Sequence, residues 1–319
     1  MSTKRIVFMG TPDFAAESLR VLTDQNYNIV AVVTAPDRPS GRGQKINQSA
    51  VKRLALELKL PVLQPIKLRD PEFLDSLRQL NPDLIIVVAF RMLPEVVWSM
   101  PNMGTINLHA SLLPQYRGAA PINWAIINGE TCTGVSTFFI NEKIDTGHLL
   151  LQQEVAIDEN MNAGRLHDIL METGAQLITK TLEKLFKQNI SSRPQSIMKE
   201  GELLKEAPKL KKADSRIDWN QPVQNVHNLI RGLSPYPGAW TIFSKSQNEI
   251  FLAKIYTCSP GTKDDKDKPG TICISDNKHL RIKCADAYLD ILKLQPEGKK
   301  SLSAEEFLRG FRGTINSAQ

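Results

Sequence analysis

Cysteine is scarce in this chain of 319 residues, and its four cysteines follow no metal-binding or disulfide pattern. Cys132, Cys258, Cys273 and Cys284 show neither a Cys-x-x-Cys spacing nor a nearby pair of histidines. Structural zinc sites and disulfide frameworks are recognised by such spacings. We therefore expect no metal ion, no disulfide framework and a reducing compartment.

The sequence also lacks three kinds of segment that would indicate other functions. No apolar run approaches the ~18 residues that a membrane helix needs. The opening MSTKRIVFMG passes directly into an apolar run and is too short for a signal peptide. Gly10 ends that run, but no Gly-x-Gly-x-x-Gly follows it, which argues against dinucleotide binding. These absences predict a cytoplasmic protein with no membrane partner.

Positive charge is concentrated in the second part of the chain. Residues 1–200 hold 21 Lys and Arg against 20 Asp and Glu, whereas residues 201–319 hold 19 against 14. Most of the net charge of +6 therefore falls in the shorter part. Such an excess favours a polyanionic partner, nucleic acid first, although a solvated Lys-rich surface gives the same composition.

The first part of the chain alternates short apolar runs with helical patterns. Runs of strand length lie at 5–10, 28–34, 82–90, 104–111, 134–141 and 148–157, and helical patterns at 11–25, 49–59, 70–80 and 163–188. Apolar runs between helices are typical of parallel strands that are buried on both faces. The pattern predicts an open α/β sheet with its ligands at the carboxyl ends of the strands.

The second part of the chain has a different pattern. It begins after a polar, proline-containing stretch and has a helical pattern near 222–232. Short alternating runs then lie at 239–244, 249–257, 270–276, 279–285 and 288–295, and the segment 260–270 reads as an exposed loop. The pattern predicts a small barrel or sandwich, with a capping box starting a helix at Ser303. The expected division is a first domain of residues 1–189, a linker of 190–208 and a second domain of 209–319.

One strand of the first domain carries polar side chains on a single face. In TINLHAS, Thr105, Asn107 and His109 alternate with apolar residues. A loop with two prolines follows, and Asp145 lies in a glycine-containing turn further on. Asn107 can donate to a developing oxyanion, His109 can move a proton and Asp145 can set the charge of His109. This set suits acyl transfer to an external amine. Alternatively, His109 is a core histidine and Asn107 bonds the backbone.

The run INLHASLLPQYRGAAP, followed by IDTG, resembles the formyltetrahydrofolate-dependent formyltransferase family. The segments FMGTPDFA, TAPDRPSGRGQK, RIDWNQP, IRGLSPYPGAW and LQPEGKKSLSAEEFLRG resemble its methionyl-tRNA formyltransferase members, so the resemblance covers nearly the whole chain. It implies a Rossmann-like domain with a predominantly parallel sheet, followed by a small OB-like β-barrel. It also implies transfer of a formyl group from 10-formyltetrahydrofolate to methionyl initiator tRNA in translation initiation, by a cytoplasmic monomer without a metal.

The resemblance also implies roles for individual residues. The family's catalytic residues match Asn107, His109 and Asp145. Its folate-binding segments match Ser111, Leu112, Leu113 and Pro114, together with Phe90, Arg91, Met92 and Leu93. Its loop at the acceptor end of tRNA matches residues 34–50, with Arg38, Arg42 and Lys45, and we expect Lys209, Lys211 and Lys212 to contact tRNA as well. The loop has almost no apolar side chains, so we expect it to lack a fixed structure without tRNA.

Two other functions remain open from the sequence. The first is another folate-dependent formyltransferase, or a formyl-folate hydrolase, that acts on a small molecule; the DRPSGRGQK segment and the basic second domain argue against it. The second is a noncatalytic RNA-binding protein, against which the presence of Asn107, His109 and Asp145 argues. The residue that accepts the amine proton, either His109 or a water held by Asp145, is also left open.

Overall fold

The structure is a computed structural model, and it describes residues 3–40, 45–195, 203–245, 250–263, 266–311 and 315–319. Unit 1 comprises Met1–Gly118, Thr133–Ala156 and His167–Glu206, and unit 2 comprises Ala119–Cys132, Ile157–Leu166 and Ala207–Gln319. Two short segments that precede His167 therefore belong to unit 2. The domain boundaries at residues 189 and 209 stay a prediction. Among the described helices, none is long and apolar enough to cross a membrane.

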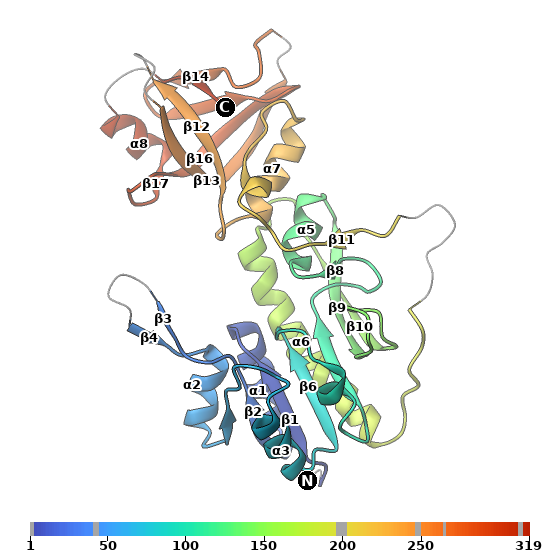
Figure 1. Cartoon of the computed structure of the whole chain (residues 1–319). Coiled ribbons are helices and arrows are strands. Elements are labelled where there is room, and N and C mark those ends of the chain that lie inside the picture. Colours follow the sequence, from blue (N-terminus) through green and yellow to red (C-terminus); the bar gives the residue numbers. More distant parts are fainter. Residues whose placement is uncertain (1–2, 41–44, 196–202, 246–249, 264–265, 312–314) are drawn as a thin grey trace. The chain divides into compact units, whose positions relative to one another are not determined.

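Within the described residues, unit 1 is built on a seven-stranded sheet (Figure 1). In spatial order its strands are β5 (Val62–Leu63), β2 (Ile29–Val33), β1 (Ile6–Gly10), β6 (Leu84–Val88), β7 (Thr105–His109), β9 (Cys132–Phe139) and β10 (Leu149–Ala156). β1 pairs in parallel with β2 and β6, β2 with β5, and β6 with β7, whereas β9 runs antiparallel to β7. This order confirms the predicted Rossmann-like, predominantly parallel sheet.

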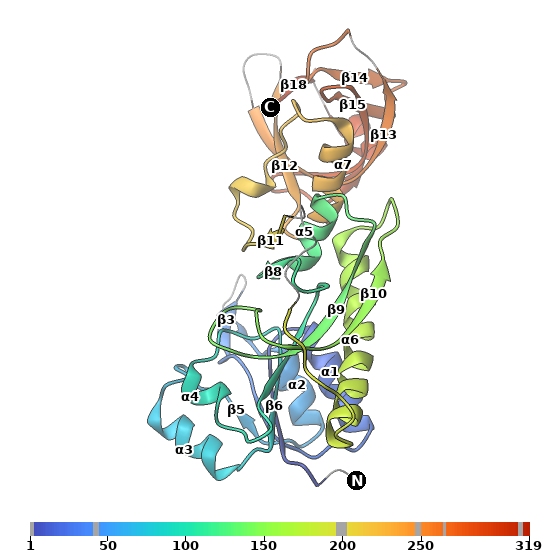
Figure 2. The ribbon, with the colours of Figure 1, turned by 90° about the vertical axis from the view of Figure 1, so that its right-hand side faces the viewer.

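Helices cover both faces of this sheet, as its apolar strands require. Every residue of β1 and β6, which read IVFMG and LIIVV, is buried. One face packs against α3 (Pro71–Gln79) and α4 (Glu95–Trp98). The other face is covered by α1 (Asp13–Asp24), α2 (Ala50–Glu57) and α6 (Ala163–Phe186), as Figure 2 shows. The ends of the strands are then the places where a ligand can reach the sheet.

The strand order reverses between β1 and β6, next to the strand that carries Asn107 and His109. From β1 the chain moves through β2 to β5 at one edge, and it then returns to β6 and continues to β10. Open α/β sheets bind ligands outside the carboxyl ends of their strands near such a reversal. β6 ends at Val88 and β7 at His109, so the segments 89–94 and 110–118 both leave the sheet there. The fold therefore brings both predicted folate-binding segments to one edge.

Residues 34–50 contain two short strands that the sequence pattern did not indicate. β3 (Arg38–Ser40) and β4 (Lys45–Asn47) pair antiparallel, with Arg38 opposite Asn47. Backbone pairing of this kind needs no apolar side chains, which is why composition did not indicate it. Arg42 lies between these strands in the chain and is outside the described residues.

Unit 2 contains an antiparallel sheet that is nearly closed on itself. In spatial order its strands are β14 (Ile272–Ser275), β15 (His279–Lys283), β16 (Ala287–Pro296), β13 (Ile250–Lys263), β12 (Ala239–Lys245) and β18 (Ile315–Ala318), and β17 (Leu302–Ser303) pairs with β16. The backbone N–H of Ala318 donates to the carbonyl of Gly270 at 2.9 Å, and Thr271 bridges Ser317, so the last strand approaches β14. The sheet confirms the predicted small barrel.

One strand of unit 2 differs from the sequence pattern, and its helices agree with it. β13 continues to Lys263, so the start of the predicted charged loop at 260–270 is strand. β13 pairs with β16 as far as Lys263, and register shifts in this pairing accommodate Pro260 within the strand. α7 (Val223–Gly232) and α8 (Ala304–Gly310) lie where helices were expected, and Ser303 forms the capping box with Glu306.

The sequence pattern missed the helix α5 (Pro121–Ile127), which belongs to unit 2. Its seven residues are too few for a clear helical period. The Asn123 side chain donates to the carbonyl of Gly232 at 2.8 Å. A Cβ on Gly232 would meet the Ile127 side chain at 2.7 Å, so α5 and α7 pack closely. Tertiary packing therefore stabilises this short helix. The remaining short elements are β8 (Arg117–Gly118), β11 (Glu206–Ala207) and the 3-10 helix η1 (Ala213–Ser215).

Candidate active site

The polar face of β7 points toward the α3 and α4 side of the sheet, where Asn107 lies beside Val87 of β6 and Phe138 of β9. Thr105, the first residue of this face, donates its hydroxyl to the carbonyl of Trp98 at 2.7 Å. Thr105 therefore holds α4 in place, and the two residues nearer the carboxyl end, Asn107 and His109, remain for chemistry.

His109 is buried, and its surroundings determine the position of its proton. Nε2 lies 2.8 Å from the carbonyl oxygen of Tyr116. A carbonyl only accepts hydrogen bonds, so Nε2 carries a proton and Nδ1 holds the lone pair of the neutral ring. Nδ1 lies 3.8 Å from Oδ2 of Asp145, which is too far for a hydrogen bond but close enough for a charge interaction once Nδ1 holds a proton. Any proton that His109 takes or gives therefore moves at Nδ1, on the side of Asp145.

Asp145 lies in the turn that joins β9 and β10. Its backbone is in the left-handed region, with φ of 54°. Its Oδ2 accepts a hydrogen bond from the backbone N–H of Gly118 at 2.9 Å. Within the turn, the Asn141 side chain accepts from the backbone N–H of Lys143 at 3.1 Å and from the hydroxyl of Thr146 at 3.0 Å. The carboxylate thus has a defined orientation toward His109.

Asn107 differs from its neighbours because its side-chain amide forms no hydrogen bond with any described residue. The side chain is half-buried at the carboxyl edge of the sheet. Buried amides normally find a hydrogen-bond partner in the protein or in water. The Asn107 amide therefore lies on the same face of β7 as the His109 imidazole, which has the Asp145 carboxylate beside it. Together they can stabilise an oxyanion and move a proton.

The segment Ser111–Pro114 is held by two side chains that the sequence analysis did not single out. Ser136 of β9 donates to the carbonyl of Ser111 at 2.6 Å and accepts from the N–H of Leu113 at 3.1 Å. Gln152 of β10 donates to the carbonyl of Leu113 at 2.9 Å. The Ser111 hydroxyl donates to the carbonyl of Gln115 at 2.6 Å. Ser111 and Leu113 are buried, whereas Leu112 and Pro114 are half-buried and face outward more.

The segment Phe90–Leu93 divides between core and surface. Leu93 is buried in the core beside α3 and α4, and Phe90 packs partly against the same core. The Arg91 guanidinium lies 5.5 Å from the Phe90 ring centre and donates to the carbonyls of Ile66 and Pro65. Burial and the charge of Arg38 lower the pKa of Arg91. Met92 is 76% exposed, so its side chain is open to a ligand or to solvent.

Polar contacts anchor the base of the β3–β4 hairpin. Asp37 accepts hydrogen bonds from Lys52 Nζ at 2.6 Å and from Gln64 at 2.9 Å, and these bonds hold the pKa of its carboxyl below the ordinary value. Arg38 follows directly and is exposed. Of Lys45 the structure describes the backbone, which lies in β4.

In unit 2, Lys209, Lys211 and Lys212 are exposed. Lys211 and Lys212 line a groove of about 590 Å³ together with Tyr236 and Trp240. Lys212 Nζ lies 5.9 Å from the Trp240 ring centre, and Tyr236 is 82% exposed. A groove with cations and aromatic rings, one of them exposed, has the chemistry that nucleic acid backbones and bases require. Lys209 does not line it.

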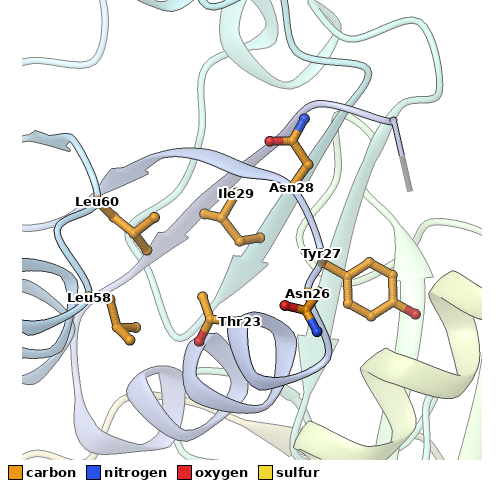
Figure 3. A pocket seen from close by; sticks show the side chains of 7 residues that line it. All are labelled: Thr23, Asn26, Tyr27, Asn28, Ile29, Leu58 and Leu60. Carbon is orange, nitrogen blue, oxygen red and sulfur yellow. The ribbon is translucent and has the colours of Figure 1, made fainter. Parts of the chain in front are cut away.

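Another hollow, of about 430 Å³, lies at the opposite, amino-terminal edge of the sheet (Figure 3). Leu58, Leu60 and Ile29 line one part of it, and the Tyr27 ring points toward α6, where it packs 6.1 Å from Phe186. Its lining has apolar, hydroxyl and amide groups but no charged side chain or imidazole. This hollow does not offer the acid–base groups that acyl transfer needs.

The described residues also contain no group of three or more His, Cys, Asp or Glu side chains that could hold a metal ion. All four cysteines are free thiols. Burial raises the pKa of Cys258, and burial and the charge of Asp286 raise the pKa of Cys284 to about 12. These two thiols stay protonated at neutral pH and lie in the core of the barrel.

Comparison with known proteins identifies the family. Residues 4–182 match the formyl transferase family, and residues 209–312 match the C-terminal domain of formyl transferases. The chain is 50% identical over 310 residues to a methionyl-tRNA formyltransferase of Bacteroides fragilis, which covers 97% of this chain and 96% of that protein. A methionyl-tRNA formyltransferase of Flavobacterium johnsoniae is also 50% identical over 310 residues, covering 97% of each chain.

Solved structures show the same fold. HypX from Aquifex aeolicus, in complex with tetrahydrofolic acid, matches with a TM-score of 0.62 at 19% identity over 99% of this chain and 51% of that chain. An N-formyltransferase from Helicobacter canadensis, in complex with folinic acid and dTDP-3-aminofucose, matches with a TM-score of 0.62 at 18% identity, over 91% and 98%. The chain therefore belongs to the formyl transferase family, and over almost its whole length it is 50% identical in sequence to methionyl-tRNA formyltransferases.

Proposed function

We propose that this enzyme transfers the formyl group of 10-formyltetrahydrofolate to the α-amino group of methionine on initiator tRNA, for translation initiation. The observation that carries the proposal is the 50% identity to methionyl-tRNA formyltransferases over 97% of the chain. The polar set Asn107, His109 and Asp145 at the carboxyl edge of the sheet supports it independently, because these groups suit acyl transfer to an amine.

In the proposed reaction the methionyl amine attacks the formyl carbon, and the bond from that carbon to the folate nitrogen then breaks. Asn107 donates to the oxyanion of the tetrahedral intermediate. His109 Nδ1 takes the proton that the attacking amine loses and returns it to the departing folate nitrogen, so that no proton is gained or lost. The Asp145 carboxylate, 3.8 Å from Nδ1, stabilises the imidazolium that forms in between. The hydrogen bond from Nε2 to Tyr116 supports Nδ1 as the acceptor.

We assign folate binding to the two segments that leave the sheet beside this site, Ser111–Pro114 and Phe90–Leu93. The network of Ser136 and Gln152 supports the first, because it holds the Ser111–Leu113 backbone rigid next to β7. The exposed Met92 supports the second, because it offers an apolar contact to a planar ligand.

We assign tRNA contacts to Arg38, Arg42 and Lys45 of the hairpin and to Lys209, Lys211 and Lys212 of unit 2. The groove beside Trp240 and the excess of basic residues after residue 200 support the second set. In this assignment residues 1–189 perform the chemistry, residues 190–208 link the domains and residues 209–319 grip tRNA. The protein acts as a cytoplasmic monomer that needs no metal ion.

The proposal is tested by incubating the protein with 10-formyltetrahydrofolate and methionyl-tRNA and following formylmethionyl-tRNA. We expect catalytic turnover with initiator tRNA. Formyl-folate consumption without methionyl-tRNA would instead show a hydrolase, and formylation of a small amine alone would show a small-molecule transferase. Binding of tRNA without any product would show a noncatalytic RNA-binding protein.

The groove gives a separate prediction. Changing Lys211 and Lys212 together to Ala should raise KM for methionyl-tRNA about 3- to 10-fold and make its salt dependence shallower, because phosphate contacts are lost. The KM for formyl-folate should not change. Lys293→Ala, which removes an exposed lysine of the same barrel outside the groove, is the matched control. Equal effects of both changes would mean that net charge alone, and not this groove, attracts tRNA.

A further inference from the structure

Gln195 lies in the polar stretch that the sequence analysis assigned to the linker, yet in the structure it contacts the turn that carries Asp145. Its side-chain Nε2 donates to the carbonyl of Asp145 at 2.8 Å and to the carbonyl of Gly147 at 2.9 Å. Two residues earlier, Arg193 and Leu149 exchange backbone hydrogen bonds of 2.8 and 2.9 Å. The segment is therefore held beside the start of β10, and the Gln195 side chain binds the backbone of the turn.

The other end of the Gln195 amide reaches the loop that follows β7. Its Oε1 accepts hydrogen bonds from Nε of Arg117, at 3.1 Å, and from a terminal guanidinium nitrogen of Arg117. Arg117 lies between the two residues whose backbones hold the catalytic side chains. Tyr116 accepts from His109, and Gly118 donates to Asp145. One amide thus joins both backbone segments that orient the His109 and Asp145 pair.

The Asp145 turn requires such support because its own geometry is restricted. Asp145 has a positive φ of 54°, a region that residues other than glycine seldom adopt. Gly147 has no room for a side chain, because a Cβ there would lie 1.6 Å from the carbonyl oxygen of Phe139. Residues in sparsely populated backbone regions persist where surrounding contacts hold them. Gln195 supplies two such contacts, one on each side of Thr146.

We propose that Gln195 is a positioning residue for formyl transfer, and that it holds Asp145 against His109 by joining the 145–147 turn to Arg117. The proposal rests on the proposed function. The hydrogen bonds of Gln195 go to Arg117, Asp145 and Gly147 and not to His109, so it acts by keeping the carboxylate where the imidazolium forms. A small displacement of a charged group from the reacting centre is enough to lower the rate strongly.

The test compares Gln195→Ala and Gln195→Glu with Ser192→Ala. Gln195→Glu keeps an acceptor for Arg117 but replaces the two N–H donors by oxygen, which faces the carbonyls of Asp145 and Gly147. Ser192→Ala changes an exposed side chain of the same segment and leaves the backbone pairing of Arg193 with Leu149. We expect both Gln195 variants to lose about 10- to 100-fold in kcat, with KM for methionyl-tRNA within about twofold of wild type. Ser192→Ala should keep its kcat.

A second comparison separates positioning from general stability. In an Asp145→Asn background, Gln195→Ala should cause little further loss in single-turnover rate, because the charge that it positions is already gone. An equal loss in both backgrounds, an unchanged kcat in folded Gln195→Ala or a loss confined to KM would each overturn the proposal. Thermal unfolding identifies variants that fail to fold. If Gln195→Ala fails to fold, the kcat of Gln195→Glu tests the proposal in its place. Absence of formylmethionyl-tRNA with wild-type protein would overturn the proposed function itself, and this inference with it.

Discussion

Asn107→Ala is expected to lower kcat about 10²- to 10³-fold with little change in KM for either substrate. Its amide has no hydrogen-bond partner among the described residues, so in the proposed reaction its N–H groups serve the oxyanion, which exists only in the transition state and intermediate. Loss of one oxyanion donor has this magnitude in other acyl-transfer enzymes. The measurement is steady-state formylation of methionyl-tRNA, with thermal unfolding as a check that the fold is intact.

The partner residues should show related losses. His109→Ala removes the group that carries the proton at Nδ1 and should also lower kcat about 10²-fold or more. Asp145→Asn keeps an acceptor oxygen for Gly118 but removes the charge opposite the imidazolium. His148→Ala is the matched control, because His148 is exposed and lies three positions after Asp145. Near-normal kcat in a folded Asn107 or His109 variant, or an equal loss in His148→Ala, would contradict the assignment.

Gly147→Ala is expected to affect stability and turnover together. The new Cβ would lie 1.6 Å from the carbonyl oxygen of Phe139, and that atom belongs to the backbone of β9. The turn must therefore move away from the strand, and it carries Asp145 with it. Overpacking of this kind costs about 1–3 kcal/mol of the free energy of unfolding. We also expect kcat to fall at least about 10-fold, because the distance from Asp145 to His109 changes.

The measurement for Gly147→Ala pairs chemical unfolding with kcat, and Gly310→Ala serves as its control. A Cβ at Gly310 would meet no atom within 4 Å, so the same substitution there has space. It should leave kcat unchanged and the free energy of unfolding within about 0.5 kcal/mol of wild type. If Gly147→Ala were as stable and as active as Gly310→Ala, the tight turn at Asp145 would not be required for the reaction.

The residues that carry the proposed chemistry could be found in the sequence because they interrupt an apolar pattern. Asn107 and His109 alternate with buried Ile106 and Leu108, and a strand at the centre of a sheet does not place polar groups on one face without a use for them. The order of apolar runs and helical patterns also predicted the sheet, since parallel strands are buried on both faces. Asp145 was found from its glycine-containing turn between two strand patterns and then from the resemblance of IDTG, because no local pattern connects it with His109 across 36 positions.

The residues that support the site could not be found in this way. Ser136 lies on β9 and Gln152 on the edge strand β10, at the antiparallel end of the sheet, where a polar residue among apolar ones is ordinary alternation. Gln195 lies in a polar, proline-containing stretch whose composition is that of a linker. The hairpin β3–β4 was missed for a related reason, because backbone pairing holds it and the side chains carry no signal.

The sequence by itself determined the long strands and helices, that a basic barrel follows an α/β sheet, and which side chains can perform acyl transfer. These properties depend on periodicity, composition and side-chain chemistry, and all of them are local along the chain. The tertiary structure alone decided that His109 presents Nδ1 to Asp145, that Tyr116 and Gly118 orient the pair, and that Gln195 joins the two loops. Hydrogen bonds between residues 7 to 78 positions apart depend on directions and distances within a few tenths of an ångström, and only the packed fold sets these.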